Sequence, residues 1–191
     1  MRCGKPVEKE EQEFCADCSR HEAAFEQGRS LWIHKEPVSS AIYRLKYKNK
    51  RYYGEIFAEE LVNRFSRQIR IWGIQEIVPV PLHKKRMKKR GYNQAAVIAD
   101  VVAGKMNIPV KIDAVRRVVN TKPMKELDDT ERIKNLKNAF CIAKGYIPKQ
   151  RILIIDDIFT TGNTIHRVAE TLKNAGAEKV YFLTISIGQG L

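Results

Sequence analysis

The chain has 191 residues, of which 43% are hydrophobic and 30% are charged, so it is long enough for one ordinary domain with a substantial core. Its 35 lysines and arginines against 22 acidic residues give a formal net charge of +13, which favours polyanionic partners such as nucleic acid or phosphorylated small molecules. No apolar run approaches the roughly 20 residues that span a bilayer, and Met1–Pro6 lacks the apolar middle of a secretory signal. We therefore expect a soluble, cytoplasmic protein that does not span a membrane.

Three of the four cysteines lie within the first 18 residues, at Cys3, Cys15 and Cys18. In a reducing compartment such a cluster indicates metal binding rather than disulfides, and the C-x-x-C spacing of Cys15 and Cys18 is typical of a zinc knuckle. Structural zinc takes four ligands, so the fourth is expected to be either a cysteine directly before Met1 or His21. The alternative is that three cysteines form no metal site.

We divide the chain into a partial zinc-knuckle segment at residues 1–30 and an α/β domain at residues 31–191. Residues 1–30 are polar and show no strong periodicity. Apolar residues at helical spacing then predict one helix from Pro37 and a second from Gly54. A basic run separates them and contains Arg44, Lys46, Lys48, Lys50 and Arg51.

Beyond Gly73, short apolar runs alternate with helical patterns. Strands are predicted at 76–80, 114–119, 151–156 and 179–185, and helices at 93–105 and 162–176. The first of these helices is expected to face the core with Ala96, Val97, Val101 and Val102. The run at 151–156 is apolar up to its aspartate, as in a strand buried on both faces of a parallel sheet. This alternation predicts an α/β fold whose parallel sheet binds ligands at the carboxyl ends of its strands.

The strongest functional signal lies at the end of that run, where Asp156 and Asp157 precede a hydroxyl-rich turn and a helix. The turn consists of Thr160, Thr161, Gly162, Asn163 and Thr164. Backbone amides at the helix start, together with the threonine hydroxyls, form a phosphate cradle. Carboxylates do not bind phosphate directly, so this pair is expected to face sugar hydroxyls or a divalent cation. A ribose 5-phosphate satisfies both requirements. The chain contains no G-x-x-x-x-G-K-[ST] loop and no G-x-G-x-x-G after a strand, which excludes P-loop and dinucleotide-binding sites.

This segment closely resembles the phosphoribosyl-pyrophosphate motif of type I phosphoribosyltransferases. The resemblance implies that Asp156 and Asp157 hold the ribose hydroxyls with Mg²⁺ nearby, and that residues 160–164 wrap the 5-phosphate. It also implies a type I phosphoribosyltransferase-like parallel sheet flanked by helices.

Other segments narrow the resemblance. The strand end at Val78–Leu82 leads into Arg90-Gly91-Tyr92-Asn93-Gln94, which is similar to the ComF family of competence proteins. That family couples an N-terminal zinc knuckle to a phosphoribosyltransferase-like domain, and Arg90 would there serve the pyrophosphate. Residues 117–140 follow a loop pattern of the same family. The chain departs from the family at Met124, where Gln is usual, and in its incomplete first knuckle.

Six of the eight residues from His83 to Arg90 are basic, which is too dense for one pyrophosphate. The candidate DNA-binding residues are Lys84, Lys85, Arg86, Lys88 and Lys89. The alternative is a solvated charged loop in which Arg90 alone contacts ligand. The nearby aromatic residues are either stacking platforms for bases or part of the core. They are Tyr43, Tyr47, Tyr52, Tyr53 and Tyr92.

The ComF resemblance implies a role in natural transformation, in which the protein handles incoming single-stranded DNA and meets proteins of the uptake machinery. The alternative is an active phosphoribosyltransferase that transfers phosphoribosyl to an acceptor nitrogen. No nucleobase-binding signature identifies an acceptor. A third interpretation is a transcriptional regulator that senses the metabolite.

Overall fold

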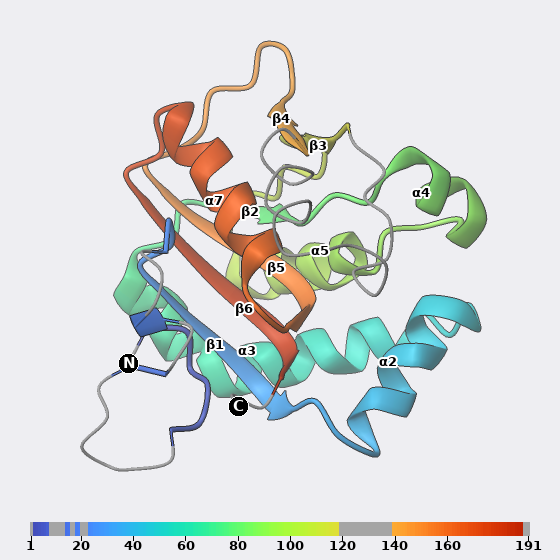
Figure 1. Cartoon of the computed structure of the whole chain (residues 1–191). Helices are drawn as coiled ribbons and strands as arrows, with labels where there is room; N and C mark the ends of the chain where they lie inside the picture. The colour runs from blue at the N-terminus through green and yellow to red at the C-terminus, as the bar shows by residue number, and fades with distance from the viewer. Residues whose placement is uncertain (1, 8–13, 16–17, 20–22, 119–138, 189–191) are drawn as a thin grey trace.

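The computed structural model describes residues 2–7, 14–15, 18–19, 23–118 and 139–188 (Figure 1). In chain order the elements are β1 (Gln27–Ile33), α2 (Val38–Tyr47), α3 (Tyr52–Trp72), β2 (Glu76–Pro79), α4 (Lys84–Arg90), α5 (Gln94–Met106), β3 (Val115–Arg117), β4 (Phe140–Ile142), β5 (Arg151–Phe159), α7 (Asn163–Asn174) and β6 (Lys179–Ile187). Within these residues, no helix combines the length and the apolar character that crossing a membrane requires.

The centre of the molecule is a four-stranded sheet in the order β1-β6-β5-β2, and all of its strand pairs are parallel. β3 and β4 form a separate antiparallel pair. Figure 1 shows α7 in front of the sheet and α3 and α5 behind it. The prediction of an α/β fold with a parallel sheet flanked by helices is confirmed.

Alternation along β5 builds two cores, because successive side chains of a strand point to opposite faces of its sheet. Ile152 and Ile154 pack on the side of α7, and Leu153 and Ile155 pack on the side of α3 and α5. All four are fully buried. This double burial explains why the strand is continuously apolar rather than alternating.

Among the described residues, three elements were not predicted by the sequence patterns: β1, β4 and a helix at α4. β1 begins at Gln27 and pairs with β6, so it crosses the predicted boundary at residue 30. The basic run that was expected to be a loop is helical at α4. His83 caps its first turn by accepting a hydrogen bond from the Lys85 amide, and Gly91 ends it in the left-handed region. Long basic side chains lose little rotamer freedom in a helix, which is compatible with this outcome.

The predicted core face of α5 was wrong in part. Of the four residues expected inside, only Val102 is fully buried, while Ile98, Ala99 and Ala103 take the inner positions. α5 is apolar on most of its circumference, so the pattern of its residues does not select a face. The predicted core face of α7 is confirmed, with Ile165, Val168, Ala169 and Leu172 buried.

Candidate functional site

The two adjacent carboxylates lie on β5 at the point where its neighbour β2 ends. The last register pair between these strands is Pro79 with Ile155, whereas the pairing with β6 continues through Asp156 to Phe159. The carboxylates therefore lie inside the strand, which is longer than the predicted 151–156. Asp156 is 8% exposed and Asp157 is 4% exposed. From Asp156 onward, β5 is no longer paired with β2.

Asp157 is held by side chains from two helices. Its Oδ1 lies 2.9 Å from Lys46 Nζ on α2, and its Oδ2 accepts a hydrogen bond of 2.7 Å from Gln94 Nε2 on α5. Strand alternation accounts for this, since Asp157 has the same parity as Leu153 and Ile155, which face these helices. Sequence reasoning missed both partners. Gln94 lay within the quoted Arg90–Gln94 motif, but nothing in the basic run distinguished Lys46 from its neighbours.

Asp156 has the opposite parity and different surroundings. Its Oδ1 accepts a hydrogen bond of 2.8 Å from the backbone amide of Asp157. Burial, together with the Asp157 carboxylate, raises the pKa of Asp156 from 3.8 to about 7, against the lowering effect of Lys46 and Arg117. A carboxyl group with such a pKa is readily protonated near neutral pH. A hydroxyl donor or a cation at this position would favour its ionised form.

The hydroxyl-rich turn connects β5 to α7. Thr160, Thr161 and Asn163 are exposed, and Gly162 and Thr164 are half-buried. Gly162 is the N-cap of α7 and forms no side-chain cap hydrogen bond, so the amides of the first helical turn meet no capping side chain. Such amides are suited to an anion.

The structure gives a specific reason for glycine at position 162. Its φ is +81°, and a Cβ there would lie 2.7 Å from Cζ of Phe159. Both the left-handed backbone and the Phe159 ring therefore exclude a larger residue.

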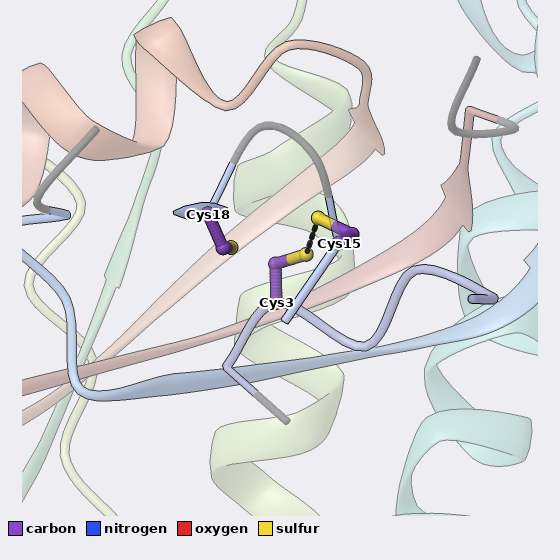
Figure 2. A group of neighbouring side chains, drawn as sticks. All are labelled: Cys3, Cys15 and Cys18. Atoms are coloured by element: carbon purple, nitrogen blue, oxygen red, sulfur yellow. Dashed lines mark hydrogen bonds between the residues drawn. The ribbon is translucent and has the colours of Figure 1, made fainter. Parts of the chain in front are cut away.

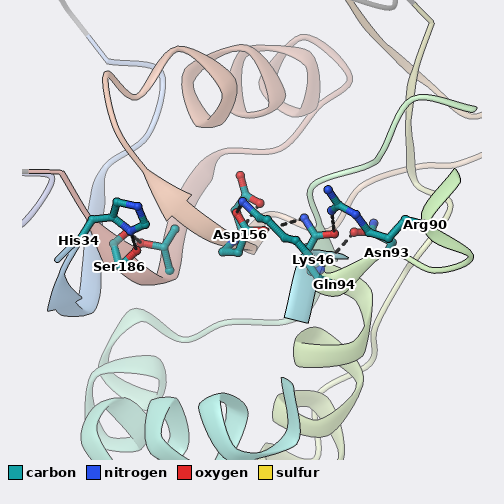
Figure 3. Close-up of polar contacts among 10 residues, drawn as sticks. His34, Lys46, Arg90, Asn93, Gln94, Asp156 and Ser186 are labelled. Atoms are coloured by element: carbon teal, nitrogen blue, oxygen red, sulfur yellow. Dashed lines mark hydrogen bonds and ion pairs between the residues drawn. The ribbon is translucent and has the colours of Figure 1, made fainter. Parts of the chain in front are cut away.

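Arg90 connects α4 to the carboxylates. Its Nη1 donates to Oε1 of Gln94, the residue that also holds Asp157, and its guanidinium carbon lies 5.2 Å from the centroid of the Tyr47 ring. Figure 3 shows Lys46, Gln94 and Arg90 together beside Asp156. The five other basic residues of α4 are exposed, namely Lys84, Lys85, Arg86, Lys88 and Lys89.

A second polar group lies at the same edge of the sheet, where β1 and β6 end. His34 Nδ1 is 2.9 Å from Ser186 Oγ, and Ser30 Oγ is 2.6 Å from Thr184 Oγ1. In Figure 3 this His34–Ser186 pair lies on the side of Asp156 opposite to Lys46. Sequence reasoning missed these residues, because β1 was not predicted and its partner β6 lies some 150 residues downstream.

The three N-terminal cysteines converge. Their sulfur atoms all lie within 4.8 Å of one another, and the sulfurs of Cys3 and Cys15 are 3.4 Å apart (Figure 2). Cys3 and Cys15 are buried and belong to the core on the α7 face. Burial raises the pKa of the thiols of Cys3 and Cys18. His21, the alternative fourth ligand, lies outside the described residues.

Most of the family's loop pattern also lies outside the described residues, which exclude 119–138 and so Met124. The two ends of the pattern are described and pair with each other. Arg117 on β3 is in register with Phe140 on β4, and its guanidinium carbon lies 5.4 Å from the centroid of the Phe140 ring. The charge of Arg117 acts on Asp156 and lowers its pKa, so this end of the pattern lies near the carboxylates.

Comparison with known proteins places these features in a family. The phosphoribosyl transferase domain family matches residues 89–186, just over half of the chain. The chain is 31% identical over 183 residues to competence protein F of Haemophilus influenzae, covering 93% of this chain and 80% of that protein. It is 27% identical over 169 residues to the DNA utilization protein YhgH of Escherichia coli, covering 87% of this chain and 74% of that protein. It is 26% identical over 182 residues to competence protein ComFC of Bacillus subtilis, covering 91% of this chain and 71% of that protein.

Among solved structures, the adenine phosphoribosyltransferase of Leishmania tarentolae matches with a TM-score of 0.44 and 15% identity, covering 76% of this chain and 74% of that chain. A likeness this weak adds nothing to the assignment. The sequence matches carry it, because they extend across most of both chains and include β5 with its two carboxylates. The chain therefore belongs to the phosphoribosyl transferase domain family and, within it, to the competence protein F family.

Proposed function

We propose that this protein binds phosphoribosyl pyrophosphate, or a related phosphosugar, with Mg²⁺ at the carboxyl edge of the sheet, and that it handles incoming single-stranded DNA through α4. The observation that carries the proposal is the contact between α4 and the residues around the β5 carboxylates. Arg90, the last residue of the basic helix, bonds to the same glutamine that holds Asp157. The proposed setting is the cytoplasm, where reducing conditions keep thiols available. Proteins of the DNA-uptake machinery are the further partners that this role implies.

The phosphosugar part of the proposal rests on complementary chemistry at one edge. Asp156 and Asp157 would hold the ribose hydroxyls, and Mg²⁺, which prefers carboxylate and phosphate oxygens, would bind beside them. The 5-phosphate would bind to the α7 amides and to the hydroxyls of the turn formed by Thr160, Thr161, Gly162, Asn163 and Thr164. Arg90 would neutralise pyrophosphate charge.

The DNA part rests on charge and on the relatives. α4 exposes five cations on seven residues, more than one pyrophosphate requires. The relatives carry the names competence protein F, DNA utilization protein and competence protein ComFC. Cations that neutralise phosphates bind nucleic acid without sequence preference, because the backbone charge is the same for every sequence.

The cysteine cluster fits structural zinc. In a tetrahedral site with Zn–S bonds of about 2.3 Å, the sulfurs lie roughly 3.8 Å apart. The three thiols lie within 4.8 Å of one another, so Cys3, Cys15 and Cys18 would bind the ion with little rearrangement. A variant extended by one cysteine before Met1 should hold about one zinc per chain, because it completes the four-ligand set. Elemental analysis measures this, and an extended protein without metal would contradict the proposal.

Two titrations of the unmodified protein test the proposed function. Calorimetry with phosphoribosyl pyrophosphate should show binding that strengthens when Mg²⁺ is present. Fluorescence anisotropy with a labelled oligothymidine should show binding in the micromolar range or weaker, with a slope of log affinity against log salt of about −3 to −4 for four to six phosphate contacts. Absence of both signals would reject the proposal.

The enzymatic alternative is tested in the same samples. Phosphoribosyl transfer breaks the bond between the sugar and pyrophosphate, so turnover releases pyrophosphate into solution. A coupled pyrophosphate assay with candidate nitrogen acceptors therefore separates a binding protein from a transferase. Binding without release supports the proposed function, and release establishes the alternative.

A further inference from the structure

Helix α2 presents two tyrosines to solvent on one face. Tyr43 is 54% exposed and Tyr47 is 58% exposed, and their ring centroids lie 4.9 Å apart. They are four residues apart, so they lie one above the other on the helix. The opposite side of α2 is secured by Ile42 and Leu45, which are buried. The two rings are therefore held on an anchored helix without being part of the core.

The other tyrosines of the region have different surroundings. Tyr92 is 7% exposed, and its hydroxyl donates to the backbone carbonyl of Leu45, so its ring is a core element. Tyr52 is 49% exposed, but its ring stacks on that of half-buried Tyr53, with centroids 4.4 Å apart. Tyr47 lies against Arg90 of α4, and Tyr43 lies against Tyr47.

Cations adjoin this pair. The Arg90 guanidinium carbon lies 5.2 Å from the Tyr47 ring centroid, which brings the end of α4 against α2. Figure 1 shows α2 and α4 on the same side of the molecule. Arg44, next to Tyr43 in the chain, is exposed as well. Two accessible rings with cations around them match the chemistry of single-stranded nucleic acid, whose bases present flat apolar faces beside a charged backbone.

We propose that Tyr43 and Tyr47 form a base-stacking surface for single-stranded DNA, while the α4 cations hold the phosphates of the same strand. The inference rests on the proposed DNA-binding function and extends it to a different kind of contact. Duplex DNA does not fit, because its base faces are stacked inside the helix. The α4 cations determine the salt dependence of binding, and the tyrosines determine how much affinity the bases add.

Two probes and two pairs of variants test this surface. The probes are an oligothymidine of about 15 nucleotides, within the site sizes usual for such proteins, and an abasic strand of the same length. The variants are Tyr43→Leu/Tyr47→Leu, which removes the rings, and Tyr43→Phe/Tyr47→Phe, which keeps them. Because both side chains are exposed, neither change disturbs the core, and circular dichroism verifies the fold.

The unmodified protein should bind the oligothymidine at least about 10-fold more tightly than the abasic strand. The leucine variant should lose this difference and keep the salt slope, since no cation is removed. The phenylalanine variant should behave like the parent. Equal affinity of the parent for both strands, or a leucine variant that still prefers the oligothymidine, would overturn the stacking surface. Failure of the proposed function looks different, because the parent would then bind neither strand at low salt.

Discussion

The end of β5 and the helix α4 are linked through Gln94 but opposite in physical character. The carboxylates of Asp156 and Asp157 are less than 10% exposed and are held by named partners. The five leading cations of α4 are exposed, and the cap of this helix comes from His83 rather than from any of them. A buried charge depends on its immediate partners, because the interior screens poorly. Exposed cations attract a polyanion collectively, so their effect depends on how many there are and on the ionic strength that screens them.

This difference gives the two regions different sensitivities. A single substitution among the carboxylates or their partners should have a large effect on one ligand or on stability. Each substitution on α4 should weaken DNA binding by a small amount, and these amounts should add up. Raising the salt concentration should weaken DNA binding in the same way. The following predictions test that division, from the largest expected effect to the smallest.

The double variant Asp156→Asn/Asp157→Asn should lose phosphoribosyl-pyrophosphate binding by at least about 100-fold, because two charge-assisted contacts to hydroxyls or Mg²⁺ are removed. Calorimetry in the presence of Mg²⁺ measures the loss. Single-stranded DNA binding should be retained, since the variant carries two fewer negative charges and leaves α4 intact. Unchanged ligand affinity would reject the site assignment.

The variant Lys46→Met should lower the free energy of unfolding by about 2–3 kcal/mol, because it leaves the buried Asp157 carboxylate without its cation. The value is below that of a fully buried pair because the Lys46 side chain is 18% exposed. Urea unfolding at pH 7 measures it. Adding Asp157→Asn to Lys46→Met should recover most of the loss.

A matched control for this pair exists on the surface. Lys105 and Glu59 form an ion pair of 3.1 Å with side chains 44% and 56% exposed. The variant Lys105→Met should cost less than about 1 kcal/mol, because solvent screens the pair. If Lys46→Met and Lys105→Met lowered the free energy of unfolding equally, the distinction between buried and exposed charges would be lost.

On α4, the fourfold variant Lys85→Ala/Arg86→Ala/Lys88→Ala/Lys89→Ala should flatten the salt slope of DNA binding by about 0.7 for each DNA phosphate that is no longer neutralised. Arg90 is left unchanged because it also bonds to Gln94. Phosphoribosyl-pyrophosphate binding should change little. Anisotropy titrations at several salt concentrations measure the slope.

The control removes the same number of charges elsewhere. The exposed lysines chosen are Lys111, Lys144, Lys149 and Lys179. Their replacement by alanine should weaken DNA binding only through the lower net charge, with a slope close to that of the parent. A slope that is identical in the α4 variant and the parent would move the DNA surface to residues 44–51.

The last prediction is a pH dependence of stability. The pKa of Asp156 is raised from 3.8 to about 7, so between these values the folded chain holds a proton that the unfolded chain has lost. The free energy of unfolding should therefore fall as pH rises from about 4 to 7, because the folded chain binds more protons than the unfolded chain in this range. The variant Asp156→Asn should lack this decline. Urea unfolding of both proteins at pH 5, 6 and 7 measures the difference, and parallel curves would contradict it.

The sequence by itself determined the features that are carried by contiguous residues. β5, its two carboxylates, the hydroxyl-rich turn and α7 follow one another within 151–174, so local pattern was enough to place them. The C-x-x-C spacing likewise predicted a cysteine cluster, although only the structure shows that Cys3 lies beside Cys15 and Cys18. The basic composition of α4 was also evident, whereas its helical form was not.

Only the tertiary structure decided which residues complete the site. Lys46 differs from its basic neighbours because its position on α2 reaches Asp157, more than 100 residues away in the chain. His34 meets Ser186 because parallel strands that are neighbours in a sheet need not be neighbours in sequence. The separation of exposed Tyr47 from buried Tyr92 has the same origin, since burial depends on how α2, α4 and α5 pack together rather than on residue type.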